Sequence, residues 1–310
     1  MAFVELLDGL PMEYEEAGEG KKVLLLVHGN FASARWWRPL LTRLPKGYRA
    51  LAPSLRGFGN TPAAGEESLR QLAKDLEAFA VAKGLGRVHL VGHSLGAAVA
   101  LQHAVDFPKR DRSLALLAPA PTAGFARMRQ GQSRLARMLR AFDTDSPTAV
   151  LQLHAALAMG RAFGTNRSVL SSSLREMLGE ATLEPGEFDA LVDDAVRVRT
   201  DTTVAFLREL QHWDVRRELG RLKTPVLLVW GEKDPIVPRE AVEDSVRDFR
   251  RARLEVWPDA GHSPQFEHPE RTMATLTGFA EHATLLGRIR RALRMRRKAQ
   301  AAAALVVTRP

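Results

Sequence analysis

The sequence predicts an α/β fold in which helices cover both faces of a mostly parallel central sheet. Strand-like and helix-like segments alternate through residues 1–121 and again from Trp213 onward, as is typical of such sheets. Residues 23–27 form a continuous aliphatic run, which is expected of a strand buried on both faces. Residues 122–212 contain helix-like segments but no strand-like run, so we expect a helical insertion there.

Before the insertion, strands and helices are expected in a regular order. The expected strands cover residues 3–7, 12–17, 23–27, 48–52, 88–91 and 113–118, and the expected helices cover residues 33–44, 68–83 and a segment that begins at residue 97. The helix at 68–83 is predicted from apolar side chains at positions 69, 72, 76 and 79, which are spaced for one helical face.

The insertion and the segment after it continue this pattern. Helices are expected at residues 135–142, 148–159, 170–178, 188–198 and 202–211. Ser146-Pro147 and Glu184-Pro185 have the composition of helix starts. Strands are expected at residues 226–230 and 254–257, followed by a final core helix at about residues 269–283.

Length and composition exclude several classes of protein. The 310 residues suffice for one large core with an inserted subdomain. The sequence contains no run of 18 or more apolar residues, so no membrane span is expected. The first residues lack the features of a signal peptide, so we expect a cytoplasmic protein. Without cysteine there is no disulfide, no thiol nucleophile and no cysteine metal site.

The positive charge is concentrated at one end of the chain. The formal net charge is +9, but eight basic residues and no acidic residue follow residue 284, which leaves +1 for residues 1–284. The folded body is therefore expected to be near neutral, and the charge does not indicate a nucleic-acid-binding fold.

The pentapeptide Gly92-His93-Ser94-Leu95-Gly96 is the most specific motif. It lies between a strand-like run and a helix start rich in small residues, the setting of a nucleophile elbow. Glycines at 92 and 96 allow strand, turn and helix to approach closely, so that the Ser94 hydroxyl can point toward a substrate. The following helix directs free backbone N–H groups at an anion formed beside Ser94.

Two further residues complete a candidate catalytic triad. Asp234 lies just past the strand expected at 226–230, and His262 follows the strand at 254–257 and Gly261. Ser94 is the expected nucleophile, His262 the base that activates it, and Asp234 the carboxylate that orients the imidazole. Glu232 is the second choice for the carboxylate because it lies closer to the strand end.

The order Ser94, Asp234, His262 resembles the α/β-hydrolase superfamily, in its capped serine-esterase and haloperoxidase-like branch. The resemblance implies the α/β-hydrolase fold, with a core at residues 1–121 and 213–284, a helical lid at 122–212 and a basic tail at 285–310. The insertion leaves the core beside the carboxyl end of a strand, where ligands bind in open α/β sheets. We therefore expect the lid to cover Ser94.

The resemblance also implies an oxyanion hole. The backbone N–H of Leu95 is one expected donor, and His28-Gly29-Asn30-Phe31 resembles the family's H-G-x motif that supplies the second. Phe31 is the favoured second donor, and Asn30 remains the alternative. Asn30 and His93 are possible pocket residues. Ser54 stands where many relatives carry aspartate, which argues against a catalytic role at this position.

These features predict a serine hydrolase that cleaves small esters, thioesters or lactones through an acyl-enzyme, without a cofactor or metal. A carboxylate nucleophile, as in dehalogenases and epoxide hydrolases of this fold, is excluded by Ser94. Carbon–carbon bond hydrolysis, peracid formation and a non-catalytic ligand-binding role remain alternatives. A small acyl compound is the expected partner and nucleic acid is not; the basic tail could contact an anionic surface weakly, and the oligomeric state is left open.

Overall fold

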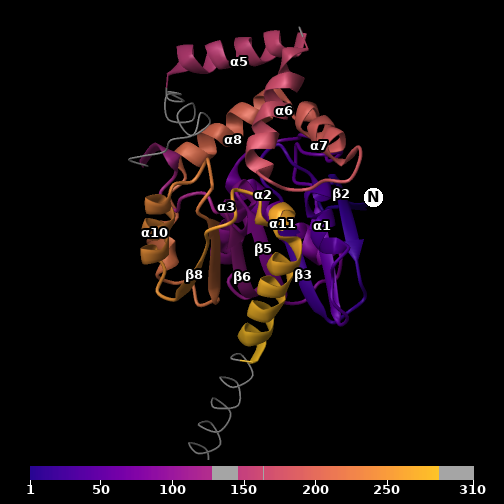
Figure 1. Cartoon of the computed structure of the whole chain (residues 1–310), viewed down its shortest axis with the longest axis vertical. Helices are drawn as coiled ribbons and strands as arrows, with labels where there is room; N and C mark the ends of the chain where they lie inside the picture. Colours follow the sequence, from indigo (N-terminus) through magenta and orange to yellow (C-terminus); the bar gives the residue numbers. More distant parts are fainter. Residues whose placement is uncertain (128–145, 163, 286–310) are drawn as a thin grey trace, which may run out of the picture.

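The central feature of the fold is an eight-stranded sheet. The computed structural model describes residues 1–127, 146–162 and 164–285 (Figure 1). The strands are β1 (Ala2–Glu5), β2 (Pro11–Ala17), β3 (Lys22–Val27), β4 (Tyr48–Pro53), β5 (Val88–His93), β6 (Asp111–Leu117), β7 (Val226–Gly231) and β8 (Ala252–Trp257). Their order is β1-β2-β4-β3-β5-β6-β7-β8. Only the β1–β2 and β2–β4 pairs are antiparallel, so the predicted mostly parallel sheet is confirmed.

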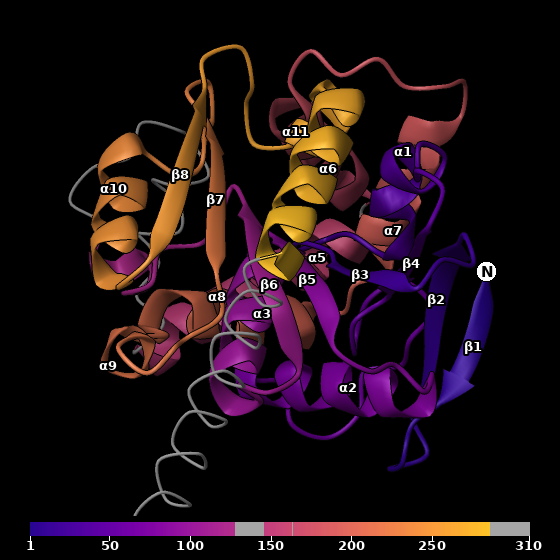
Figure 2. The ribbon, with the colours of Figure 1, turned by 90° about the horizontal axis from the view of Figure 1, so that it is seen from below.

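Alternating side chains divide the core into two layers. In β3, Leu25 and Val27 face one hydrophobic cluster, whereas Leu24 and Leu26 face the other. The first cluster contains side chains of helices α2 (Leu69–Ala82), α3 (Leu95–Asp106) and α10 (Arg239–Asp248). The second contains side chains of η1 (Ala34–Trp37), α1 (Arg38–Leu41) and the helix at residues 269–285. Figure 2 shows α2 and α3 on one face of the sheet and the C-terminal helix on the other.

The helix expected at residues 33–44 is broken in two. The Ser33 hydroxyl accepts a hydrogen bond from Arg35 N and begins the short 3-10 helix η1. Pro39 lies in the first turn of α1, where its missing N–H is not needed. The break therefore follows from a cap and a proline that cannot continue an uninterrupted helix.

The described part of the insertion is helical. It contains η2 (Phe125–Arg127), α5 (Pro147–Ala162), α6 (Thr165–Leu178), α7 (Glu187–Arg197) and α8 (Thr200–His212), followed by the short α9 (Arg216–Leu219). The helix expected at 135–142 and the tail from residue 286 lie outside the described residues. Figure 1 shows α5 to α8 together at one end of the molecule.

Buried polar contacts join the insertion to the core. Asp194 in α7 accepts a hydrogen bond from the Ser33 hydroxyl at 2.6 Å and forms an ion pair with Arg35 at 3.0 Å. The Glu209 carboxylate in α8 accepts a hydrogen bond from Leu69 N at 2.8 Å, at the start of α2. Such contacts fix helices α7 and α8 over the loops that follow β3 and β4.

A buried histidine joins α2, α3 and the start of β6. His103 Nδ1 lies 3.2 Å from Asp111 Oδ2, and its Nε2 lies 3.3 Å from Glu77 Oε2. Burial alone lowers the pKa of His103, but hydrogen bonds to the two carboxylates outweigh burial and raise the pKa to about 8. The protonated imidazole is therefore the form that stabilises this part of the fold.

We expect the protein to lose stability as the pH rises from 6.5 to about 8. The folded-state pKa of His103 lies above its ordinary value of 6.5, so its contribution is complete below 6.5 and disappears as the imidazole loses its proton. His103→Gln should remove about 2 kcal/mol of this pH dependence. Urea unfolding of both proteins on either side of this range measures it, and identical pH profiles would contradict the assignment.

Candidate active site

Ser94 occupies a sharp turn between β5 and α3. Its backbone has φ 53 and ψ −117, a conformation that is strained for a residue with a side chain. A Cβ at Gly92 would lie 2.3 Å from Gly96 O, and one at Gly96 would lie 2.2 Å from Val27 O. Only glycine fits at both positions, so the motif's glycines are required by the close approach of strand and helix. The partly exposed Ser94 is thereby held at the carboxyl end of β5.

Asp234 and His262 lie side by side at the carboxyl ends of neighbouring strands. His262 Nδ1 donates to Asp234 Oδ2 at 2.8 Å, and both side chains are fully buried. Asp234 Oδ1 accepts hydrogen bonds from Ile236 N at 2.7 Å and Val237 N at 3.0 Å. The carboxylate is thus fixed by its own loop and fixes the imidazole in turn. Glu232, the alternative, instead pairs with Arg239 at 3.0 Å.

The second nitrogen of His262 is buried and has no hydrogen-bond partner in the part of the chain that the structure describes. The Nδ1 bond to Asp234 leaves Nε2 as the nitrogen available for proton transfer. The ring centroid of His262 lies 5.0 Å from that of His93, the residue before Ser94. The imidazole therefore lies beside the elbow, and Nε2 can accept a proton.

His93 holds the elbow and the histidine loop together. Its Nε2 donates to the carbonyl of His262 at 2.8 Å, and its Nδ1 accepts from Trp36 Nε1 at 3.1 Å. Burial keeps the pKa of His93 well below its usual range, so the ring stays neutral and suits this donor–acceptor pair. Because the side chain is fully buried and both nitrogens are occupied, the geometry favours a positioning role over the pocket role expected from sequence.

The geometry of the loop after β3 favours Asn30 over Phe31 as the second oxyanion donor. The backbone N–H of Phe31 donates to Asn30 Oδ1 at 3.0 Å, and Phe31 adopts φ 59. This N–H is therefore occupied by the neighbouring side chain. The Asn30 N–H has no hydrogen bond to another described residue, so the geometry favours Asn30, the alternative left open by the sequence. Leu95 is the first residue of α3, where an N–H has no intrahelical acceptor.

Glu267, which the sequence analysis did not identify, supports the histidine loop. Its Oε2 accepts from Gly261 N at 2.5 Å and its Oε1 from Ser263 N at 3.0 Å. Both donors flank His262 directly. Glu267 ends the short helix α11 (Pro264–Glu267), which begins with Ser263-Pro264. The bond from Ser263 N to Glu267 is like one half of a capping box, but the glutamate lies four residues after the serine and the Ser263 side chain makes no capping hydrogen bond, so the only signal in the sequence is the Ser-Pro helix start.

We expect Glu267→Gln to lower kcat about tenfold or more with little change in KM, because a small displacement of a catalytic base is costly. An amide offers one acceptor oxygen where the carboxylate uses two. Ester hydrolysis by the variant measures the effect. Glu270→Gln is the matched control, since Glu270 is exposed and pairs with Arg43 instead. Equal kcat in Glu267→Gln and Glu270→Gln contradicts the positioning role.

The carboxylate of Glu13 binds Ser54 and the loop that follows β4. Ser54 Oγ donates to Glu13 Oε2 at 2.8 Å and accepts from Ala34 N at 2.9 Å. Asn60 N also donates to Glu13 Oε2, at 3.0 Å. A buried carboxylate from β2 therefore holds the loop after β4, and the Ser54 side chain takes part in that contact.

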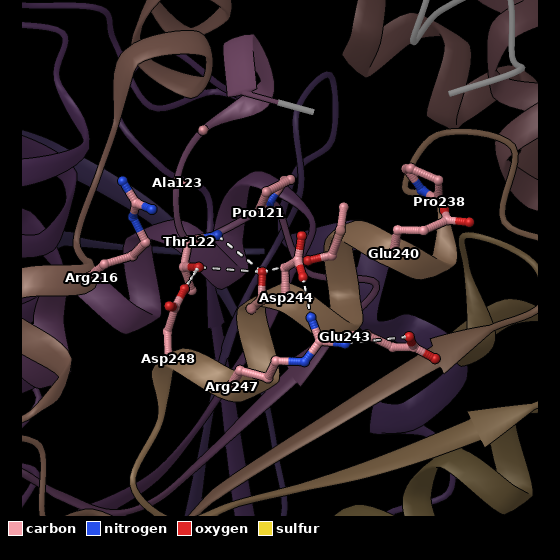
Figure 3. A pocket seen from close by; sticks show the side chains of 13 residues that line it. Pro121, Thr122, Ala123, Arg216, Pro238, Glu240, Glu243, Asp244, Arg247 and Asp248 are labelled. Atoms are coloured by element: carbon pink, nitrogen blue, oxygen red, sulfur yellow. Dashed lines mark hydrogen bonds and ion pairs between the residues drawn. The ribbon is translucent and has the colours of Figure 1, made fainter. Parts of the chain in front are cut away.

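A pocket of about 580 Å³ lies beside α10, where the chain leaves β6 for the insertion (Figure 3). Its lining does not include Ser94, Asp234 or His262. Thr122 N donates to Ser245 Oγ at 3.2 Å, and the Thr122 hydroxyl donates to Asp248. These contacts brace the start of the insertion against α10. No group of three or more side chains suited to hold a metal ion occurs within residues 1–127, 146–162 and 164–285.

Comparison with known proteins supports the fold described above. A family model described as alpha/beta hydrolase fold matches residues 22–269. The chain is 28% identical over 263 residues to a 2-hydroxy-6-oxo-6-phenylhexa-2,4-dienoate hydrolase of Comamonas testosteroni, covering 83% of this chain and 86% of the relative. It is 29% identical over 279 residues to a pimeloyl-[acyl-carrier protein] methyl ester esterase of Neisseria meningitidis, covering 87% and 96%.

Solved structures show the same fold. An esterase from Exiguobacterium antarcticum superposes with a TM-score of 0.71 at 21% sequence identity, covering 90% of this chain and 99% of that chain. An enol-lactonase from Burkholderia xenovorans superposes with a TM-score of 0.70 at 17% identity, covering 89% and 98%.

Proposed function

The chain belongs to the α/β-hydrolase family and is a hydrolase, and on this premise we propose that it cleaves small esters, thioesters or lactones through a Ser94 acyl-enzyme. The observation that carries the proposal is the 2.8 Å bond between His262 and Asp234. It leaves an imidazole nitrogen without a hydrogen-bond partner among the described residues, on a ring that lies beside His93, the residue before the strained Ser94. A neutral imidazole held in this way is the base that a weakly acidic hydroxyl needs.

The proposed reaction has two halves. The Ser94 Oγ attacks the substrate carbonyl while His262 Nε2 accepts its proton, and Asp234 stabilises the imidazolium. The N–H groups of Leu95 and Asn30 stabilise the oxyanion of the tetrahedral intermediate. His262 then returns the proton to the leaving oxygen or sulfur, and the acyl-enzyme forms. Water, activated by the same nitrogen, releases the acid and restores Ser94.

We assign the helices of residues 122–212 as a lid over this site. The buried Asp194 contacts to Ser33 and Arg35 support the assignment, because they fix α7 beside the loop that carries Asn30. Residues 128–145 and 163 of this range lie outside the described residues. The core at 1–121 and 213–284 and the tail at 285–310 remain the proposed boundaries.

We expect turnover of p-nitrophenyl esters with short to medium acyl chains, because such esters carry an activated carbonyl that a Ser94 nucleophile can attack. A series of increasing acyl length measures the activity and the depth of the pocket together. Absence of turnover across the series would favour a non-catalytic ligand-binding role.

A carbon–carbon bond hydrolase is the second candidate, favoured by the likeness to the Comamonas testosteroni hydrolase. The same serine and histidine would act on a 2-hydroxy-6-oxo-dienoate, the kind of compound that the relative's name describes. Parallel assays of such a dienoate and of the ester series decide between the two. A kcat/KM for the dienoate well above that for every ester would replace the ester proposal.

A further inference from the structure

A second cavity lies at the end of the molecule opposite the helices α5 to α8. It is a groove of about 940 Å³ between the amino ends of β7 and β8 and the helix at residues 269–285. The loops at residues 220–225 and 250–251 form its rim. Ser94, Asp234 and His262 follow the carboxyl ends of β5, β7 and β8 and are not among the residues that line the groove, so the groove is separate from the candidate active site.

The rim of the groove carries uncompensated positive charge. Its exposed basic side chains without an ion pair to any described residue are Arg221, Lys223, Arg250 and Arg251. Glu255 is the only acidic residue of the lining, and it pairs with a fifth basic residue, Arg253, at 2.9 Å. Gathering unpaired like charges is unfavourable by itself. An anionic ligand would relieve this repulsion.

The floor of the groove is apolar. Leu222 and Phe279 are half-buried, and Val226 at the start of β7 is buried. A basic rim around an apolar floor complements an amphiphile, whose anionic head meets the arginines while its carbon chain covers the floor. A free phosphate or a nucleic acid would use the rim and leave the floor exposed.

The helix at residues 269–285 forms one wall of the groove, and the sequence that follows this helix also favours an anionic amphiphile as the ligand. Leu286, Ile289 and Leu293 are spaced for one helical face among arginines, a pattern typical of segments that bind anionic membrane surfaces. With eight basic and no acidic residues, this segment cannot neutralise the groove. This segment is therefore not the anionic occupant.

We propose that this groove docks the protein on the surface of an anionic phospholipid bilayer. Arg221, Lys223, Arg250 and Arg251 bind lipid phosphates, and Leu222 and Phe279 contact the upper part of the acyl chains. The helices α5 to α8 at the opposite end then face the aqueous phase (Figure 1). The docking concerns location and is independent of the chemistry at Ser94.

Sedimentation of the full chain with vesicles tests the proposal. We expect binding to phosphatidylglycerol–phosphatidylcholine vesicles, much weaker binding to pure phosphatidylcholine, and loss of binding at high salt. Arg250→Gln with Arg251→Gln should lower the affinity about tenfold or more, because each basic residue near a bilayer contributes roughly a fivefold factor. The melting temperature of each variant verifies folding.

A matched variant removes two charges elsewhere. Lys74→Gln with Arg208→Gln alters exposed residues of α2 and α8 that line no part of the groove, and it should bind vesicles nearly as well as the parent chain. Equal losses of vesicle affinity in the two double variants would overturn the proposal, because the affinity would then depend on the net charge of the protein and not on the groove. Binding of a DNA duplex that depends on Arg250 and Arg251 as strongly as vesicle binding would also overturn it, in favour of a general polyanion site.

Discussion

Ser94→Ala should lower the turnover of p-nitrophenyl esters by about 10⁴-fold or more. Without the hydroxyl there is no nucleophile to form the acyl-enzyme, and only substrate binding and the oxyanion donors remain. Steady-state hydrolysis measures the loss. Turnover by the alanine variant at the rate of the parent chain would remove Ser94 from the reaction.

Ser94→Gly is the matched control for folding. The backbone at position 94 has φ 53 and ψ −117, which glycine adopts without the strain imposed by a Cβ. The glycine variant should therefore be equally inactive but melt at least as high as the alanine variant. Loss of activity accompanied by collapse of the melting transition in both variants would assign Ser94 to the fold rather than to catalysis.

Asp234→Asn should lower kcat by about 10³- to 10⁴-fold with little change in melting temperature. The amide keeps the shape of the side chain, but it cannot stabilise the imidazolium and can favour the wrong tautomer of His262. The two bonds from Ile236 N and Val237 N to Oδ1 need only one acceptor oxygen, so the loop should keep its conformation. The comparison with Ser94→Ala separates loss of the nucleophile from loss of the orienting charge.

Glu232→Gln is the matched control for Asp234→Asn. Glu232 lies on the same loop but pairs with the exposed Arg239, so its replacement should leave kcat nearly unchanged. A larger loss in Glu232→Gln than in Asp234→Asn would mean that the wrong acid has been assigned.

The sequence predicts the positions of Ser94, Asp234 and His262 because each follows a segment that is expected to form a strand. The parallel sheet brings the carboxyl ends of such strands to one edge, so that three residues spread over the chain can be expected to meet. The glycines at 92 and 96 add a steric requirement that no other residue meets. Roles in catalysis remain predictions for all three.

The second oxyanion donor depends on detail that residue types do not reveal. Phe31 N–H is taken by the side chain of Asn30, an interaction set by one rotamer and by the positive φ of Phe31. His93 was expected near the pocket, but its ring turns toward Trp36 and the carbonyl of His262. Both outcomes depend on the direction of a side chain within a correctly placed loop.

For Glu267, the sequence indicates the start of the short helix that carries it, but it does not indicate that this residue holds the loop of His262. Ser263-Pro264 indicates the start of a helix. Glu267 matters for catalysis because the two N–H groups that it binds belong to Gly261 and Ser263, the neighbours of His262. Only the structure shows that this glutamate also fixes the base.

Mapping the site of a serine-directed phosphonate ester tests the central claim, that Ser94 is the nucleophile, most directly. The reagent phosphonylates the hydroxyl that an adjacent base has activated, and peptide mass spectrometry locates the added group. The account predicts a single modification on the peptide that contains Ser94, formed in step with the loss of esterase activity and absent from Ser94→Ala. Modification of another residue, or full esterase activity in a protein completely labelled at Ser94, would contradict it.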